Sequence, residues 1–372
     1  MKNLPLCFLI AFLISCSTKE TTPVHDVLVE SIDSVVRAAA DTARFNGNVL
    51  VAVDGKIIYQ KSTGFANYDT KELLNDSSVF ELASVSKQFT SMGIMMLKER
   101  GQINYEDDVR KYIPELSYEG MTIRHFLTHT SGIPDYMEEF SKGWDPDRIA
   151  FNDDIIKLLA KNKPAILFKP GEKWEYSNTA YALLATIIER ISGKTYGDFL
   201  QENIFTPAGM KHTRTYNTRR SKKETIANYA YGFVYSDALE KFILPDSLKE
   251  LDYVITLDGI QGDGIVNSTT GDLFLWDQLL YKEKLIRQST LEDAFTPVKL
   301  NNDSTYQYGF GWFIRQDSIA GKRVSHSGGW PGYGTYITRF IDKNKCIIVL
   351  TNNDGYGRGT VVEQLVARLK RP

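Results

Sequence analysis

Both ends of the chain carry β-hairpin patterns, and this restricts the possible folds more than any other feature of the sequence. Near the N-terminus, Asn48–Asn67 alternates apolar and polar residues around Asp54-Gly55, which is typical of two strands joined by a tight turn. Near the C-terminus, Thr335–Asp354 predicts a second hairpin. Because the sequence between them is mostly helical, we expect an α+β fold: one antiparallel sheet formed from both chain ends, flanked by helices, with a mainly helical inserted subdomain.

Helical spacing of apolar residues recurs through the middle of the chain and at its C-terminal end. The predicted helices are Asp153–Asn162, Asn178–Gly193, Thr269–Leu280 and Thr360–Lys370. We expect residues 31–117 and 265–372 to form the sheet subdomain and residues 118–264 the helical insertion. A chain of 372 residues, 42% of them hydrophobic, is long enough to bury a large core.

The charge balance gives no reason to expect a nucleic acid partner. The chain has 44 basic and 46 acidic residues, for a formal net charge of -2. Its densest basic run, Arg219–Lys223, is short and is interpreted as a solvated loop.

The N-terminus has the pattern of a targeting segment. Lys2 precedes a short apolar run, Leu4–Ile14, which is too short to cross a bilayer as a mature helix. With Leu13–Cys16 (LISC), the segment resembles a bacterial lipoprotein signal. Residues 1–15 would be removed, Cys16 would carry the lipid, and residues 16–30 would form a tether. The alternative is an ordinary signal peptide with an incidental cysteine. We expect a protein of the bacterial cell envelope that contacts a membrane through its lipid anchor.

The cysteine count excludes an intrachain disulfide in such a mature protein. Cys7 lies in the signal and Cys16 is the proposed anchor, which leaves Cys346 alone in a predicted strand. Cys346 is therefore expected to be a buried core residue and not a nucleophile.

The segment Phe80–Gly101 (FELASVSKQFTSMGIMMLKERG) combines a helical apolar face with a pair of reactive side chains. The pattern predicts a helix that begins at Ser84, and Lys87 lies one turn later on the same face. A serine hydroxyl is a poor nucleophile until a neighbouring base takes its proton. Lysine can act as that base if burial or positive neighbours lower its pKa. The alternative is a capping serine followed by a solvent-facing lysine.

Two further stretches supply groups that suit acyl transfer. Tyr176-Ser-Asn178 precedes a predicted helix; Tyr176 could relay protons and Asn178 could donate to a substrate carbonyl. His326-Ser-Gly328-Gly329 lies just before a predicted strand, where glycines permit close approach of a ligand to the backbone. The structural alternatives are a buried tyrosine, a helix cap and a tight turn.

With these three motifs in order, the chain resembles the serine β-lactamase and penicillin-binding protein superfamily, most closely the class C β-lactamases, the DD-carboxypeptidases and related serine esterases. The surrounding sequences agree with the resemblance, which runs from about Val49 to Asn352. They are Leu127–Tyr136 (LTHTSGIPDY), Phe168–Gly193, Pro207–Met210 (PAGM) and Tyr308–Trp312 (YGFGW).

The resemblance implies a role for each motif residue and requires no cofactor. Ser84 would attack the substrate carbonyl and form an acyl-enzyme, and Lys87 and Tyr176 would share proton transfer, with the choice of general base left open. The remaining motif residues, Asn178, His326, Gly328 and Gly329, would bind substrate. The backbone N–H groups of Ser84 and Gly329 would form the oxyanion hole.

The sequence departs from the β-lactamase pattern at His326-Ser327-Gly328, where class C enzymes have Lys-Thr-Gly. A histidine of ordinary pKa is mostly neutral at pH 7, so capture of a substrate carboxylate should weaken. The form resembles esterase-like and D-amino-acid peptidase members. We therefore expect a serine acyl hydrolase of short esters, D-amino-acid peptides or β-lactams, acting on small-molecule or peptidoglycan-derived substrates.

Two other readings of the sequence remain. His125 and His129 have a spacing that can hold zinc on a helix, but no Glu follows His125 as the metalloprotease motif requires. The second alternative is a non-catalytic penicillin-binding-like sensor or cell-wall binding module. The sequence leaves the oligomeric state open.

Overall fold

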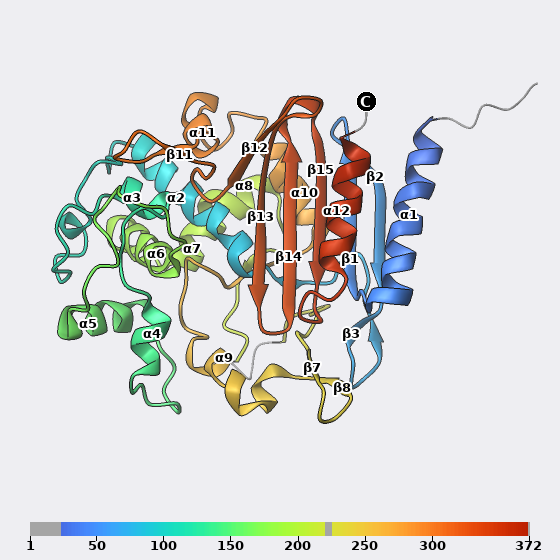
Figure 1. The fold of residues 1–372 in the computed structure, drawn as a ribbon, viewed down its shortest axis with the longest axis horizontal. Helices are drawn as coiled ribbons and strands as arrows, with labels where there is room; N and C mark the ends of the chain where they lie inside the picture. Colours follow the sequence, from blue (N-terminus) through green and yellow to red (C-terminus); the bar gives the residue numbers. More distant parts are fainter. Residues whose placement is uncertain (1–23, 220–224, 371–372) are drawn as a thin grey trace, which may run out of the picture.

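The computed structural model describes residues 24–219 and 225–370 of the chain. An antiparallel sheet forms its centre, with strand order β12-β13-β14-β15-β1-β2. These strands are β1 (Gly47–Val53), β2 (Lys56–Thr63), β12 (Phe313–Asp317), β13 (Gly321–Trp330), β14 (Tyr333–Phe340) and β15 (Lys345–Thr351). Strand β15 pairs with both β14 and β1, so the two predicted hairpins join edge to edge and the two chain ends share one sheet, as expected (Figure 1).

Alternating side chains along the central strands divide the core between the two faces of the sheet. Val49 and Val51 of β1 face one apolar cluster with residues of α1 (Val24–Ala43) and α12 (Arg358–Leu369). Leu50 and Ala52 belong to the larger cluster on the opposite face. This period of two is the expected consequence of the pleated backbone.

The second face of the sheet is covered by α10 (Thr270–Leu279) and by the turn that leads into α2 (Lys87–Glu99). A buried ion pair joins this layer to the sheet: Arg339 of β14 donates to the Asp277 carboxylate of α10 over 2.6 Å, and both side chains are 1% exposed. Removing either partner would leave an uncompensated buried charge.

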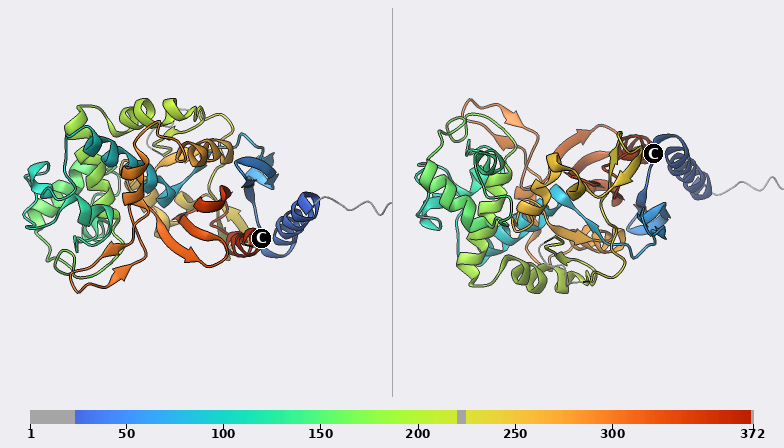
Figure 2. Two further views of the ribbon diagram at one scale, coloured as in Figure 1. Left: turned by 90° about the horizontal axis from the view of Figure 1, so that it is seen from above. Right: turned by 90° about the horizontal axis from the view of Figure 1, so that it is seen from below.

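The helical part of the molecule lies beside the sheet and packs around α2 (Figure 2). Its helices are α3 (Ile123–Leu127), α4 (Tyr136–Ser141), α5 (Asn152–Asn162), α6 (Asn178–Ser192), α7 (Tyr196–Leu200), α8 (Thr206–Ala208) and α9 (Tyr253–Thr256), with α11 (Gln288–Ala294) later in the chain. Gly193 ends α6 with a φ of 69°, in the left-handed conformation that favours glycine.

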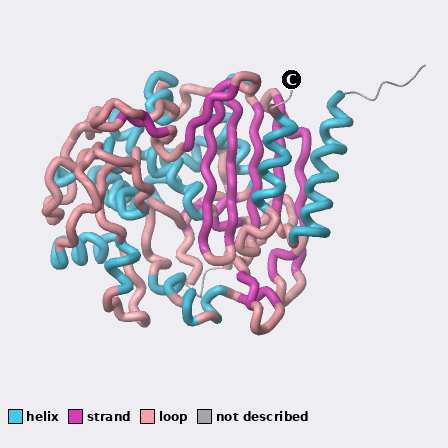
Figure 3. Tube along the Cα trace, viewed as in Figure 1, coloured by secondary structure: helices cyan, strands magenta, loops and turns pink. Residues whose placement is uncertain are grey.

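Short strand pairs connect the helical part and the sheet layer, between long loops (Figure 3). The pairs are β3 (Phe65–Asn67) with β4 (Glu72–Leu73), β7 (Val234–Ser236) with β8 (Lys241–Ile243), and β10 (Val298–Lys299) with β11 (Thr305–Tyr306). In addition, β5 (Phe80–Glu81) and β6 (Arg214–Thr215) each pair with β9 (Val266–Ser268), which lies between them. Strands β6 to β8 lie within residues 118–264, so that region is mainly but not purely helical. The proposed subdomain boundaries stay a prediction.

The structure describes only part of the N-terminal region for which a signal segment, a lipid anchor and a tether were predicted. The signal segment and Cys16 lie outside the described residues, whereas α1 begins at Val24 and so occupies the last part of the predicted tether. Within the predicted tether, Leu28 and Val29 of α1 pack against the apolar cluster on the sheet, which explains a helix where the sequence predicted a polar tether. In residues 24–219 and 225–370, no helix combines the length and apolar character needed to span a bilayer.

Candidate active site

Ser84 lies in a short 3₁₀ turn, Ala83–Ser86, and not at the start of an α-helix as the sequence predicted. Ala83 has a φ of 47°, a left-handed conformation that interrupts regular helix geometry just before Ser84. Helix α2 begins only at Lys87, and its N-cap residue, Ser86, makes no side-chain capping bond. The Ser84 hydroxyl is therefore not used as a helix cap.

The Lys87 side chain is fully buried and its amine has three oxygen neighbours. Nζ lies 2.7 Å from the Asp263 backbone carbonyl, 2.8 Å from Asn178 Oδ1 and 3.3 Å from Ser84 Oγ. A charged amine can donate to all three. A neutral amine retains two N–H donors for the two shorter bonds and has its lone pair free to accept the Ser84 hydroxyl proton. This is the geometry that a general base requires.

Burial is the main cause that lowers the pKa of Lys87, to about 8. The carboxylates of Asp263 and Asp135 act in the opposite direction because they favour the charged amine. A substantial neutral fraction is therefore present near neutral pH, whereas a solvent-exposed lysine would be almost entirely protonated.

The Tyr176 ring lies against the same amine, with its centroid 4.8 Å from Lys87 Nζ. The Tyr176 hydroxyl is buried and makes no hydrogen bond of good geometry to a described residue. The nearby Ser84 hydroxyl lowers the pKa of Tyr176, because it favours the ionised phenol. Burial has the larger effect and raises the pKa of Tyr176 well above its ordinary value. A neutral phenol, placed to donate a proton, is thus favoured over a phenolate.

Asn178 is the first residue of α6, and the cap of that helix is its neighbour. Ser177 accepts the Ala180 N–H through its side chain, so Asn178 is released from a capping role. Because the Asn178 oxygen accepts from Lys87, its amide nitrogen remains available to donate to a substrate carbonyl.

The His326–Gly329 motif lies within the last half of β13, not just before a strand as the sequence predicted. This half of the strand forms the wall of the site opposite α6. Strand β12 pairs with β13 only as far as Ser325, so in the part of the chain that the structure describes the edge beyond Ser325 has no strand partner on this side. A Cβ on Gly328 would lie 2.2 Å from the Leu82 carbonyl oxygen and 3.1 Å from the Ser84 nitrogen. Only glycine permits this approach of the strand to the Ser84 turn. A Cβ on Gly329, by contrast, would meet no atom within 4 Å, and Gly329 lines the cavity.

His326 is buried in a chain of hydrogen bonds and does not line this cavity. The Ser177 N–H donates to His129 Nδ1, so neutral His129 has its proton on Nε2 and donates to the Tyr308 oxygen over 3.1 Å. The Tyr308 hydroxyl then donates to His326 Nε2 over 3.1 Å, and His326 Nδ1–H donates to the Ser327 carbonyl. The chain joins three distant segments and fixes both histidine tautomers.

Burial is the largest cause that lowers the pKa of His326, to about 3, and the Lys87 charge adds to it. Burial likewise holds the pKa of His129 well below its ordinary value. His326 is therefore neutral throughout the working pH range, consistent with the expectation at pH 7 but by a larger margin than an ordinary pKa gives.

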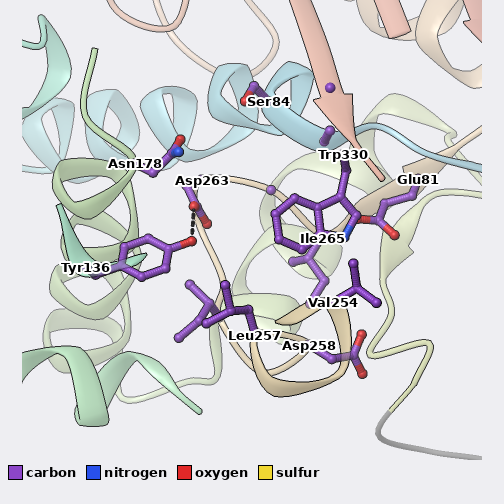
Figure 4. A pocket seen from close by; sticks show the side chains of 14 residues that line it. Glu81, Ser84, Tyr136, Asn178, Val254, Leu257, Asp258, Asp263, Ile265 and Trp330 are labelled. Carbon is purple, nitrogen blue, oxygen red and sulfur yellow. Dashed lines mark hydrogen bonds between the residues drawn. The ribbon is translucent and has the colours of Figure 1, made fainter. Parts of the chain in front are cut away.

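A cavity of about 540 Å³, its open mouth included, lies beside Ser84 (Figure 4). The residues that line it are Glu81, Ala83, Ser84, Tyr136, Asn178, Val254, Leu257, Asp258, Ile260, Asp263, Gly264, Ile265, Gly329 and Trp330. Sequence reasoning identified three of them and missed Asp263, whose carboxylate accepts the Tyr136 hydroxyl over 2.8 Å. Its position between two glycines was the only local signal.

The two histidines considered for zinc have other partners. His125 Nδ1 accepts the Thr122 N–H at the start of α3, and His129 belongs to the chain with Tyr308. Within residues 24–219 and 225–370, no three metal-ligating side chains are grouped for an ion. Cys346 is 1% exposed and unbonded, the buried core position that was predicted.

Comparisons with known proteins indicate the family and the fold of the chain. A family model described as Beta-lactamase matches residues 32–369. A penicillin-binding protein of Bacillus subtilis (strain 168) is 49% identical over 323 residues, which cover 87% of this chain and 71% of that protein.

Solved structures show the same fold. An octameric penicillin-binding protein homologue from Pyrococcus abyssi has a TM-score of 0.78 at 26% identity, covering 92% of this chain and 77% of that one. A D-amino acid amidase from Ochrobactrum anthropi SV3, complexed with L-phenylalanine amide, has a TM-score of 0.75 at 22% identity, covering 92% and 99%.

Proposed function

The chain belongs to the serine β-lactamase and penicillin-binding protein superfamily, and on that premise we propose that Ser84 is the nucleophile by which it hydrolyses esters or amides. The chain is a serine hydrolase of this superfamily. The observation that carries the assignment of Ser84 is the buried Lys87 amine, 3.3 Å from a serine hydroxyl beside an open cavity.

In the proposed acylation step, neutral Lys87 takes the Ser84 proton as the Ser84 oxygen bonds to the substrate carbonyl carbon. The negative charge formed on the carbonyl oxygen is stabilised by the backbone N–H groups of Ser84 and Gly329. The carbonyl then re-forms, the bond to the leaving group breaks, and the proton passes from Lys87 through the Tyr176 phenol to the leaving nitrogen or oxygen. Asn178 holds both Lys87 and the substrate carbonyl.

In the proposed deacylation step, water replaces the leaving group. Its proton passes to the Lys87 and Tyr176 pair, its oxygen bonds to the acyl carbon, and the ester bond to Ser84 breaks as Ser84 recovers a proton. His326 and Gly328 act through the position of β13: Gly328 by its lack of a side chain, and His326 by its bond to Tyr308.

The test is covalent labelling followed by turnover. A fluorophosphonate probe should label the wild type and should not label Ser84→Ala, while Ser62→Ala, at a partly exposed serine on β2, should label normally. Mass spectrometry of the labelled peptide must place the adduct on Ser84. Equal labelling of Ser84→Ala and the wild type would overturn the assignment.

The rival function is a sensor that is acylated and does not release the acyl group. Incubation with a penicillin and with p-nitrophenyl esters, followed by intact-mass measurement over time, separates the two. A hydrolase returns to its unmodified mass and forms product repeatedly, whereas a sensor stays acylated after one equivalent.

We also propose a lipid-anchored protein of the bacterial cell envelope, acting on small-molecule or peptidoglycan-derived substrates. The sequence Leu13–Cys16 and the preceding apolar run support it. Metabolic labelling with a palmitate analogue should mark the full chain and spare Cys16→Ser; equal label in both would contradict the anchor.

A further inference from the structure

Arg358, the first residue of α12, reaches the backbone of the two strands behind the Ser84 turn. Its Nη1 atom donates to the Gly328 carbonyl oxygen over 2.7 Å and to the Thr335 carbonyl oxygen over 3.0 Å. Gly328 of β13 and Thr335 of β14 are direct partners in the sheet. Arg358 therefore bridges the two strands at the residue of β13 that approaches the Ser84 turn.

The turn between β15 and α12 places this side chain. Gly355 has a φ of 78° and Gly357, the N-cap residue of α12, has a φ of 71°, left-handed conformations that favour glycine. A Cβ on Gly334 would lie 2.5 Å from Gly355 Cα, so the turn packs directly on β14. The start of α12 is thus held within reach of the β13 carbonyls.

Arg358 and Ser84 approach the sheet from opposite faces. Val361 of α12 belongs to the apolar cluster on one face, whereas Val85, next to Ser84, belongs to the cluster on the other face. Arg358 lines an open groove with Trp330, and the described lining of the Ser84 cavity does not include it. A substrate in the cavity is therefore separated from Arg358 by β13.

The peptide unit between Gly328 and Gly329 connects Arg358 to that cavity. The Gly328 carbonyl accepts from Arg358, and the Gly329 N–H of the same unit is one of the two proposed oxyanion donors. In a trans peptide these two groups point in opposite directions. A cation at the oxygen end polarises the unit and makes its N–H a stronger donor, because linked hydrogen bonds strengthen one another.

The charge of Arg358 is not neutralised by a neighbouring carboxylate. In the part of the chain that the structure describes, its side chain donates to the two carbonyl oxygens and forms no ion pair. Burial is the largest cause that lowers the pKa of Arg358, and Tyr336 acts in the opposite direction. Arginine stays charged in proteins, and burial reduces the screening of its charge by water.

We propose that Arg358 is a positioning residue for acyl transfer, which holds and polarises the Gly328–Gly329 peptide unit and so strengthens the oxyanion hole. The inference rests on the proposed function and gives Arg358 no contact with the substrate. Because the negative charge on the carbonyl oxygen develops only as the reaction proceeds, Arg358 should affect the rate more than the binding of a neutral substrate.

The first experiment measures kcat and KM for p-nitrophenyl butyrate in Arg358→Gln and Arg358→Lys. Loss of an oxyanion donor itself costs about a hundredfold to a thousandfold in kcat. An effect transmitted through a peptide unit is smaller, so kcat/KM of Arg358→Gln should fall by about tenfold to a hundredfold, mainly through kcat. Arg358→Lys keeps the charge without the guanidinium fork and should lose about threefold to tenfold.

The matched control is Arg368→Gln, on the same helix. Arg368 donates to Ser31 Oγ over 2.7 Å, on the side of α12 that contacts α1, so its loss should leave kcat/KM at the wild-type value. The melting temperature of each variant is measured as well. A role of Arg358 confined to fold stability would lower that temperature and leave kcat/KM unchanged in assays well below it, and this result would overturn the inference.

The second experiment measures the oxyanion hole directly with phenylboronic acid. The Ser84 oxygen bonds to boron as its proton passes to Lys87, and the adduct is a tetrahedral anion with an oxygen at the oxyanion hole. Its Ki in each Arg358 variant should rise by about the factor by which kcat/KM falls. Benzyl alcohol carries no charge and forms no adduct, so its Ki should not change.

Three results would overturn the inference. They are wild-type kcat/KM in folded Arg358→Gln, an unchanged Ki for phenylboronic acid, and equal weakening of phenylboronic acid and benzyl alcohol, which indicates a distorted cavity. If Arg358→Gln does not fold, the same comparisons are made on Arg358→Lys, where wild-type kcat/KM overturns it. Failure of the proposed function is distinguishable, because then the wild type hydrolyses no substrate and Ser84 is not labelled.

Discussion

Replacing Asp263 by asparagine should move the pH dependence of the enzyme to lower pH. The proposed base, Lys87, must be neutral, so kcat/KM is expected to rise with pH through the Lys87 pKa of about 8. The Asp263 carboxylate favours the charged amine and so raises this pKa. Without that charge the amine loses its proton more easily, and the rising limb shifts downward.

The size of the shift follows from the separation of the two charges. The Asp263 carboxylate is a charged neighbour that raises the Lys87 pKa, and we take a separation of roughly 6 Å, the outer end of the range over which a neighbouring charge shifts a pKa. At that distance, with an effective dielectric constant of about 20, two unit charges interact by about 3 kcal/mol. Since one pKa unit corresponds to about 1.4 kcal/mol, we expect a shift of about one to two pH units.

The assay is kcat/KM for a neutral ester, p-nitrophenyl butyrate, between about pH 5.5 and 9.5, because kcat/KM reports the free enzyme. Tyr136→Phe is the matched control, because it removes the 2.8 Å hydrogen bond to the Asp263 carboxylate and keeps the carboxylate charge. The pH at which kcat/KM rises in Tyr136→Phe should therefore stay near the wild-type value. If kcat/KM of Asp263→Asn rises at the same pH as in the wild type, or at a higher pH, the role of Lys87 as the titrating base is refuted.

Three further predictions test other parts of the site. Ser84→Ala should lower kcat by several orders of magnitude with an unchanged melting temperature, and wild-type turnover by the purified variant would contradict the nucleophile. Tyr308→Phe leaves two buried histidine nitrogens without their partner, so urea unfolding should show a loss of about 1–3 kcal/mol; no loss would mean that the chain of bonds contributes nothing. Gly328→Ala should reduce kcat/KM more than Gly329→Ala does, because a Cβ at position 328 meets the Leu82 carbonyl and the Ser84 nitrogen, whereas a Cβ at position 329 meets no atom. Equal effects of the two substitutions on steady-state rates would count against the close approach of β13 to the Ser84 turn.

The reactive pairs could be predicted from the sequence because they depend on short spacings. Ser84 and Lys87 are three residues apart, and the structure places the two side chains in contact even though the predicted helix starts three residues later, after a 3₁₀ turn. The two hairpins were likewise predictable, since alternation of apolar and polar residues is a local pattern. That the two hairpins share one sheet was also expected, since strands at both chain ends with helices between them favour a single antiparallel sheet; the pairing of β15 with β1 came from the structure.

The sequence by itself thus determined the fold class and the residues able to carry acyl transfer, while the tertiary structure alone decided their environment. Asp263 is 176 residues from Lys87 and Tyr136 is 127 residues from Asp263, so no local pattern links them. The same holds for the low pKa of His326 and for the pKa of Glu81, which burial raises to about 7 against the opposing effect of the Arg219 charge. Both depend on burial and on neighbouring charges, which arise only when distant segments pack around one cavity.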